Sequence, residues 1–469
     1  MKLLQIIFLI CLSYFTIAQT QLTKRIEIQA EHRNHFEFNT FYKHGAIIRY
    51  KEKKSIKYSL YDTKLNPIQN YTVSNIKNKY RRGTYNDSTS HTDYFLNYPS
   101  GQCKIVHINR KNETIKEYEL NLPQQSVIHD FIIINDCIYF ALYFKNKSKK
   151  ILYYNINTYK YKYFDISHIT FVNEIKFTSL NSSEGLIFIY SNKSKNINTC
   201  YINEPEQKIE ELLTLNYNNN KCVEITATKP KETIVISALY STENNLSTEL
   251  ISLTSITTEQ LRTRQKIIFF EDLQTLKTKE TKSSHNVQQH KPSINNGIIY
   301  WIGEFYEPGY RKNTSSAYIN GKLTPPTKSS RSFEGYQYTQ ANLIALDTTL
   351  NLIYEKTFHL YPSITPLYLH QWLAVDFENS QFNKINFSWI DRSKIEFFSL
   401  TDGKLIKDNY RQALLVHTKD KDDDIQYTSK GITAYIENQM LVFGFQKITN
   451  RNEIKGLKAR KVYFINVYK

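Results

Sequence analysis

The chain has 469 residues and a formal net charge of +17, with 36 Tyr but only 13 Gly. A basic balance of this size invites a nucleic-acid or anionic-surface function. However, the Lys and Arg residues are scattered and the sequence contains no nucleic-acid-binding motif. We therefore expect a diffuse, solvated positive surface and no specific nucleic-acid partner.

Residues 1–18 predict a secretory signal peptide. Lys2 supplies the positive start, and the run from Leu3 to Phe15 is almost wholly apolar. Thr16 and Ala18 are small residues at the −3 and −1 positions of a cleavage site before Gln19. The apolar run is shorter than the ~20 residues that span a bilayer. Residues 19–469 are therefore expected to be exported to the periplasm, the cell surface or the extracellular space, without a transmembrane segment.

Four cysteines follow the leader, and an even number in an exported chain permits two disulfides. Pairing of sequence neighbours would join Cys103 to Cys137 and Cys200 to Cys222. The other connectivities, and buried free thiols, stay open at this stage.

A repeated pattern then runs through the whole chain. Strand-like segments of alternating polarity keep ending in a large apolar residue, then Asp, Asn or Thr, then a polar turn. The first five anchors are 47, 48, 46 and 51 residues apart, and the next three gaps are 93, 54 and 65. Asp and Asn side chains favour such turns because they bond to the backbone two residues further on. The eight anchors are Tyr61-Asp62, Ile108-Asn109, Ile156-Asn157, Ile202-Asn203, Leu253-Thr254, Leu346-Asp347, Leu400-Thr401 and Ile465-Asn466.

Four short strands per repeat predict an all-β, single β-propeller of about eight four-stranded blades, with seven also compatible. The last anchor strand, residues 462–469, lacks a fourth strand after it, and the segment KRIEIQA near the N-terminus can supply one. Residues 204–215 have helix-like spacing but occupy an outer-strand position. Residues 271–296 are expected to be a polar connector, and residues 306–340 an insert within one blade.

The four-strand unit and the turn after its third strand resemble the β-propeller superfamily, including exported bacterial propellers, over nearly all of residues 19–469. The likeness is architectural, because the Gly-His and Trp-Asp motifs of WD40 repeats are absent, as are kelch, NHL and Asp-box sequences. It therefore implies no specific family, no catalytic residues and no cofactor.

The segment WIGEFYEPGYR is the first candidate site. Aromatic rings beside carboxylates and a guanidinium suit sugar or peptide binding, and two carboxylates are also what a glycosidase needs. A role in packing the insert is the competing interpretation. The candidate ligand-binding residues are Trp301, Glu304, Tyr306, Glu307, Tyr310 and Arg311.

Two weaker patterns concern metal ions. Histidines fall on the predicted connectors between blades, and an acidic run between residues 420 and 424 offers oxygen ligands of the kind Ca²⁺ prefers. Neither completes a known metal motif, so exposed loop residues are the competing interpretation and no cofactor is predicted. The metal candidates are His129, His290, His370, Asp422 and Asp424.

The missing catalytic motifs favour a non-catalytic binding or scaffold protein that uses one propeller face to capture a protein or glycan. A glycan-active hydrolase or lyase is the alternative. It requires two acidic residues, or a His and a Tyr, in one pocket. A subunit of a cell-envelope complex is the third hypothesis.

Overall fold

The fold was examined in a computed structural model of the full chain. It describes residues 22–468 apart from 31–35, 42, 53–54, 75, 77–79, 88, 135–136, 147, 167–170, 180–184, 193–196, 204–207, 216–220, 229–232, 242–249, 258–262, 271–285, 313–316, 320–321, 325–330, 361–368, 370, 377–383, 392–393, 402–403, 413–422, 438 and 451–458. The signal-peptide prediction therefore lies outside the described residues.

The first half of the chain forms consecutive antiparallel sheets whose strands follow chain order. The first sheet contains β2 (Phe36–Phe41), β3 (Gly45–Glu52), β4 (Ser55–Tyr61) and β5 (Pro67–Val73); the second contains β6 (Tyr80–Asn86), β7 (Ser90–Asn97), β8 (Gln102–Asn109) and β9 (Thr114–Asn121). The third contains β10 (Val127–Ile134), β11 (Cys137–Tyr143), β12 (Lys149–Asn155) and β13 (Tyr161–Asp165); the fourth contains β14 (Phe171–Ser179), β15 (Gly185–Asn192), β16 (Ile197–Asn203) and β17 (Lys208–Leu215).

The second half repeats this arrangement with one elaborated sheet. Next come β18 (Lys221–Thr228), β19 (Thr233–Ser241), β20 (Leu250–Thr257) and β21 (Thr263–Phe269), then the five-stranded sheet of β22 (Asn286–Gln289), β23 (Ser293–Asn295), β24 (Ile298–Lys312), β27 (Arg331–Asp347) and β28 (Leu352–His359). The last two sheets contain β29 (Ala374–Asp376), β30 (Lys384–Asp391), β31 (Lys394–Thr401) and β32 (Lys404–Gln412), and β33 (Asp423–Ile436), β34 (Gln439–Asn450), β35 (Arg460–Tyr468) and β1 (Leu22–Gln29); β25 (Ala317–Ile319) pairs only with β26 (Lys322–Thr324).

The turns that follow the third strands of the repeats have the structure that their residue types predict. The carboxylate of Asp62 accepts a hydrogen bond from the Asn66 backbone amide at 2.7 Å, and Asp347 accepts one from the Asn351 amide at 2.9 Å. In both turns the leucine directly before the asparagine has a positive φ. Leu65 is 1% exposed and Leu350 is 3% exposed. Burial of the leucine offsets the strain of this backbone conformation, which leucine rarely adopts.

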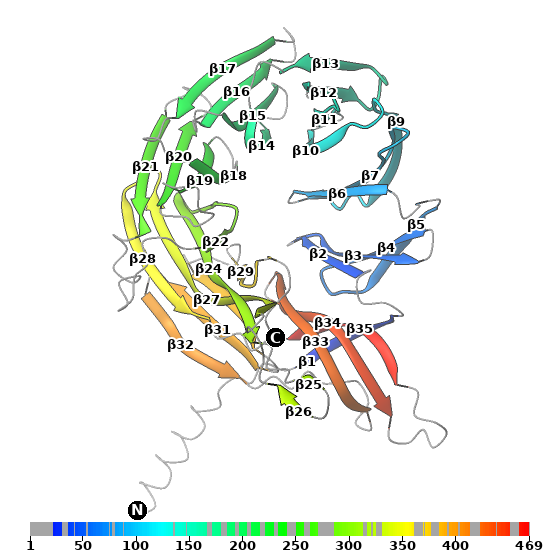
Figure 1. The fold of residues 1–469 in the computed structure, drawn as a ribbon, viewed down its shortest axis with the longest axis vertical. Helices are drawn as coiled ribbons and strands as arrows, with labels where there is room; N and C mark the ends of the chain where they lie inside the picture. Colours follow the sequence, from blue (N-terminus) through cyan, green and yellow to red (C-terminus); the bar gives the residue numbers. More distant parts are fainter. Residues whose placement is uncertain are drawn as a thin grey trace, which may run out of the picture.

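The predicted closure by the N-terminal strand is confirmed. β1 pairs antiparallel with β35, so that Ile26 lies opposite Ile465 and Ile28 opposite Tyr463. Arg25 also donates hydrogen bonds to Gln446 on β34 and to Asn466 on β35. Figure 1 shows the sheets arranged around a common centre, with the blue β1 as the edge strand of the red C-terminal sheet.

The core lies between neighbouring sheets. One apolar cluster joins the β2–β5 and β6–β9 sheets through Leu60 and Phe95, another joins the β6–β9 and β10–β13 sheets, and a further one joins the C-terminal sheet to the first. Within the described residues every element is a β-strand apart from turns and single-residue features, and no helix is long and apolar enough to cross a membrane. The chain is a single β-propeller.

At this level one sequence expectation is confirmed and another is corrected. The helix-like spacing at residues 209–213 belongs to β17, the outer strand of its sheet, as its position in the repeat had indicated. The expected polar connector, residues 271–296, instead contains β22 and β23, which pair with β24 and supply the first strands of the five-stranded sheet. These two strands are only four and three residues long, too short to show a clear alternation in the sequence.

Candidate functional site

A cavity of about 1100 Å³ lies where several sheets converge. Its walls combine first strands with the turns that join first to second strands. Its contributors come from the β2–β5, β6–β9, β18–β21, β22–β28, β29–β32 and C-terminal sheets. A volume at the upper end of the range for small-molecule sites, bounded by several repeats, makes this the first place to look for a ligand. The polar lining residues include Lys43, His44, Asp87, Glu224, Gln288, Gln289, His290, Lys291, Asn295, Gln371, Asp376 and Tyr435.

The cavity lining is polar and nearly balanced in charge. Lys43 and Lys291 are exposed cations, whereas Asp376 is 4% exposed. Asp87 and Glu224 also line the cavity and add two carboxylates to it. Amide side chains, among them Gln288 and Asn295, add groups that donate as well as accept hydrogen bonds.

Glu304 fixes the orientation of His290 beside this cavity. The carboxylate lies on β24 with its side chain fully buried, and its Oε1 is 2.5 Å from His290 Nε2. It also accepts hydrogen bonds from the backbone amides of Trp372, at 2.8 Å, and Leu373, at 3.0 Å. The His290 amide donates to the Ile302 carbonyl at 2.8 Å. His290 is therefore held by both its backbone and its ring, with its ring at the cavity wall.

Neighbouring residues reinforce the same wall. Gln289 Oε1 accepts from Ser237 Oγ at 2.6 Å and from Trp301 Nε1 at 3.2 Å. Gln371 Nε2 donates to the Gln289 carbonyl at 3.2 Å, which joins the connector before β29 to β22. Trp301 thus acts as a buried support for the wall. A Cβ placed on Gly303 would lie 2.3 Å from the Trp301 ring, so the ring packs where only glycine leaves room.

Tyr435 lines the cavity from the C-terminal end of β33. Burial raises the pKa of its phenol, its hydrogen bond with Ser388 lowers it, and the charge of Asp376 raises it again, so that the pKa is well above the usual value. The phenol therefore keeps its proton at neutral pH and can donate a hydrogen bond.

The segment predicted as a ligand site is divided by the structure. Trp301 and Glu304 are fully buried, and Tyr306 is half-buried against the β27 aromatics. Glu307 and Tyr310 are exposed on an arm formed where β24 and β27 extend beyond β22. Arg311 lies in β24, but its side chain is outside the described part. Of the five described side chains, none lines the cavity.

The metal candidates are likewise separated. His290 is at the cavity, whereas His129 stacks on Tyr143 in the β10–β13 sheet, with ring centroids 3.8 Å apart. His370 and Asp422 lie outside the described residues, and Asp424 belongs to β33 with its side chain undescribed. Over the part of the chain that is described, His, Cys, Asp and Glu residues form no group of three or more that could hold a metal ion.

The Cys103–Cys137 disulfide, one of the possibilities that the sequence left open, is not formed. Cys103 is a buried free thiol, and burial raises its pKa well above the usual range. It packs in the cluster between the β6–β9 and β10–β13 sheets, whereas Cys137 packs on the opposite side of the β10–β13 sheet, with Cys200 in the same cluster. Cys200 is not in a disulfide either, so the Cys200–Cys222 pairing is not formed, and the side chain of Cys222 is outside the described part.

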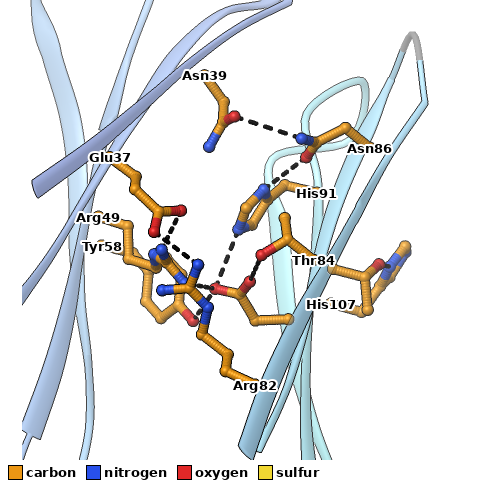
Figure 2. A network of polar contacts seen from close by, with 11 residues as sticks. Glu37, Asn39, Arg49, Tyr58, Arg82, Thr84, Asn86, His91 and His107 are labelled. Carbon is orange, nitrogen blue, oxygen red and sulfur yellow. Dashed lines mark hydrogen bonds and ion pairs between the residues drawn. The ribbon is translucent and has the colours of Figure 1, made fainter. Parts of the chain in front are cut away.

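A second buried carboxylate lies between the β2–β5 and β6–β9 sheets (Figure 2). Asp93 on β7 accepts hydrogen bonds from Tyr58 at 2.7 Å, Thr84 at 2.6 Å and Arg49 at 3.1 Å. His91 Nε2 lies 3.2 Å from the same carboxylate. Burial alone would raise the Asp93 pKa, but His91, Arg49 and the Thr84 hydrogen bond lower it far below the usual value.

Glu37 continues this network toward solvent. It pairs with Arg49 and, at 2.6 Å, with Arg82 (Figure 2). Glu37 is 42% exposed at its side chain, whereas Asp93 is fully buried. The network therefore joins the two sheets from the core to the surface without reaching an enclosed cavity.

Comparisons with known proteins give no family. No family model matches the chain, and no curated protein matches its sequence. Similar solved structures include the Dos1 propeller, with 8% identity, a TM-score of 0.44 and coverage of 96% of this chain and 95% of that one. Kluyveromyces lactis Hsv2 has 9% identity, a TM-score of 0.44 and coverage of 82% and 100%. Polysaccharide lyase Uly1 has 10% identity, a TM-score of 0.41 and coverage of 95% and 99%. Likeness at this level carries no inference about activity.

Sequence reasoning missed most of the cavity. His44, Glu224, Asp376 and Tyr435 come from four different sheets, and nothing in their local sequence distinguishes them from other turn or strand residues. The one usable indication was position in the repeat, since first strands and their following turns face the centre of a propeller.

Proposed function

We propose that this protein is an exported binding protein that holds a hydroxyl-rich ligand, a glycan, in the central cavity. Sugar hydroxyls both donate and accept hydrogen bonds, and the cavity offers amides, hydroxyls, carboxylates and ammonium groups around one space. Lys43 and Lys291 nearly balance Asp87, Glu224 and Asp376, so the charge of the lining does not strongly favour a ligand of either sign.

The observation that carries this proposal is the pre-organised His290. Its ring is held by Glu304 at 2.5 Å, and Glu304 is itself held by two backbone amides. A side chain already fixed in its binding orientation loses little conformational freedom when a ligand arrives, which favours affinity. We propose export because of the N-terminal pattern of residues 1–18. We propose a partner in the cell envelope only because export would bring the protein there.

The test is a binding screen of residues 19–469 against an array of defined oligosaccharides, followed by calorimetry with the best binder. We expect His290→Gln to weaken that binding at least ten-fold. The matched control is His129→Gln, which changes a histidine outside the cavity and should leave affinity unchanged. Equal affinity of His290→Gln and wild type, or no oligosaccharide binder at all, would refute the proposal.

A glycan lyase is the second candidate, favoured by a specific observation. His290 and Tyr435 line the same cavity, which is the His and Tyr combination that proton transfer in one pocket requires. In the proposed elimination His290 takes the proton from C5 of a uronate. The C4–O bond then breaks with formation of a C4=C5 double bond, and Tyr435 gives its proton to the departing oxygen.

This second candidate is tested by incubating the protein with polyuronates and following the ultraviolet absorbance of the new conjugated double bond. Turnover that is lost in Tyr435→Phe while binding is retained would establish the lyase. Binding without any rise in absorbance would leave the binding protein as the function.

We also propose that each sheet of four or five strands is one blade of the ring, including the closing sheet that contains β1 and β35. That assignment gives eight blades, in accord with the eight turn anchors of the sequence. An experimental structure that merges two of these sheets into one blade would contradict it.

A further inference from the structure

A second pocket, distinct from the central cavity, lies between the β6–β9 and β10–β13 sheets. Its volume is about 390 Å³, within the range of small-ligand sites. One wall is the connector from β9 to β10. The other is the turn between β11 and β12, together with one residue of β12 and one of β13. The lining residues are Pro123, Gln124, Phe144, Lys145, Asn146, Ser148, Lys150 and Tyr163.

Both walls are fixed by local hydrogen bonds. Asn146 Oδ1 accepts from the Ser148 hydroxyl at 2.7 Å and from its amide at 3.1 Å, while the Phe144 amide donates to the Ser148 carbonyl at 3.0 Å. On the other wall, the amide of Gln125 donates to the Tyr98 carbonyl and that of Ser126 to the Pro123 carbonyl. The turn that carries Lys145 is therefore ordered by its own sequence.

The pocket is positively charged and aromatic. Lys145 and Lys150 line it, and the sequence KNKSKK at residues 145–150 contains four lysines. Lys150 Nζ lies 5.8 Å from the ring centre of Tyr163, and Lys149 Nζ lies 5.3 Å from that of Tyr143. Asp165, opposite Lys150 in register, does not belong to the lining. The pocket wall thus offers cations without a carboxylate among its lining residues.

We infer that this pocket binds a sugar that carries an anionic group, as part of an acidic polysaccharide. Ammonium groups bind sulfate or carboxylate, the Asn146 and Ser148 side chains suit hydroxyls, and the Tyr163 ring offers a face for a pyranose. The turn between β11 and β12 joins a second to a third strand. It therefore lies at the opposite end of its sheet from the first-to-second-strand turns that line the central cavity, and the two sites are independent.

The experiment measures affinity for dextran sulfate, polygalacturonate, neutral dextran and a single-stranded DNA of equal charge. We expect Lys145→Gln/Lys150→Gln to weaken binding of at least one acidic polysaccharide ten-fold or more. The comparison of dextran sulfate with polygalacturonate identifies the anionic group. His290→Gln should leave this binding unchanged, so failure here is distinguishable from failure of the central-cavity proposal.

The matched control is Lys116→Gln/Lys266→Gln, which removes the same charge at exposed positions of β9 and β21. Equal loss in this control would show diffuse attraction to the whole basic surface and overturn the proposal. So would tighter binding of DNA than of either acidic polysaccharide, or equal binding of neutral dextran. A thermal melt of each variant confirms that the fold is intact.

Discussion

Two buried carboxylates occupy comparable places in this propeller and serve different ends. Asp93 lies on β7 and Glu304 on β24, each on a strand next to the innermost one, each fully buried and each beside a histidine. Every described partner of Asp93 is a side chain within the interface of two sheets. Glu304 instead accepts from two backbone amides and from His290, whose ring reaches the cavity.

The difference teaches how to separate a structural from a functional buried charge in a repeat protein. Burial and hydrogen bonding are alike at the two sites, so neither alone indicates function. The distinguishing feature is whether one partner of the carboxylate also lines the cavity. His91 is fully buried, whereas the His290 side chain is 12% exposed. The following changes test this distinction, in decreasing order of expected effect.

Asp93→Asn should have the largest effect on stability. Removing the charge leaves the buried Arg49 without its buried counterion, and breaking a buried ion pair typically costs about 3–5 kcal/mol. Urea unfolding followed by tyrosine fluorescence measures the change. Affinity for the cavity ligand, measured on the folded variant, should not change. A loss under about 1 kcal/mol would mean that Glu37 alone can hold Arg49.

Glu304→Gln should affect both stability and binding. Hydrogen bonds to a charged acceptor contribute about 1.5–3 kcal/mol, and a neutral amide cannot accept as well from Trp372, Leu373 and His290 together. His290→Gln, by contrast, should cost about 1 kcal/mol or less, because the new amide can still donate to Glu304. If Glu304→Gln lost stability but kept full ligand affinity, Glu304 would be a structural residue like Asp93.

Acid should separate the wild type from the Asp93→Asn variant. The folded-state pKa of Asp93 lies below the ordinary value of ~3.9, so its stabilisation is fully present above that value. It is lost as the pH falls from there toward the folded pKa. The free energy of unfolding of wild type should therefore drop more steeply below about pH 4 than that of the variant. Parallel pH profiles would contradict the assignment.

Glu37→Gln should have the smallest effect. Glu37 contacts Arg49 and Arg82, but its side chain is 42% exposed, and exposed ion pairs contribute about 0–1 kcal/mol. The same urea titration applies, repeated at high salt, where wild type and variant should converge. A loss as large as that of Asp93→Asn would show that the network acts as one unit.

Much of the fold could be predicted from local sequence, because each repeat contains a turn whose residue types can be recognised. Asp62 and Asp347 close their turns by hydrogen bonds that short polar side chains make to nearby backbone, so each copy is visible without the others. Pairing of β1 with β35 followed from an unpaired strand position at each end. β22 and β23 were missed because strands this short carry little periodicity.

The site was far less predictable. Glu304 was recognised as chemically notable, but its burial and its contact with the backbone of residues 372 and 373 depend on how two sheets pack. His290 was a weak metal candidate on spacing alone, and Tyr435 was not considered. These residues meet because the ring brings distant segments together, and a single sequence does not record which side chains of different repeats face each other.

The pairing of β1 with β35 also bears on how the molecule is made. Thr23 donates a hydrogen bond to the Val467 carbonyl across a separation of 444 residues. Most other sheets can assemble as soon as their own fifty or so residues leave the ribosome, but this one must wait for its final strand. Until then β1 presents an unpaired edge, which invites pairing with other chains. A nascent chain of this design therefore has one vulnerable interval, and a holdase that shields residues 22–29 would protect it through that interval.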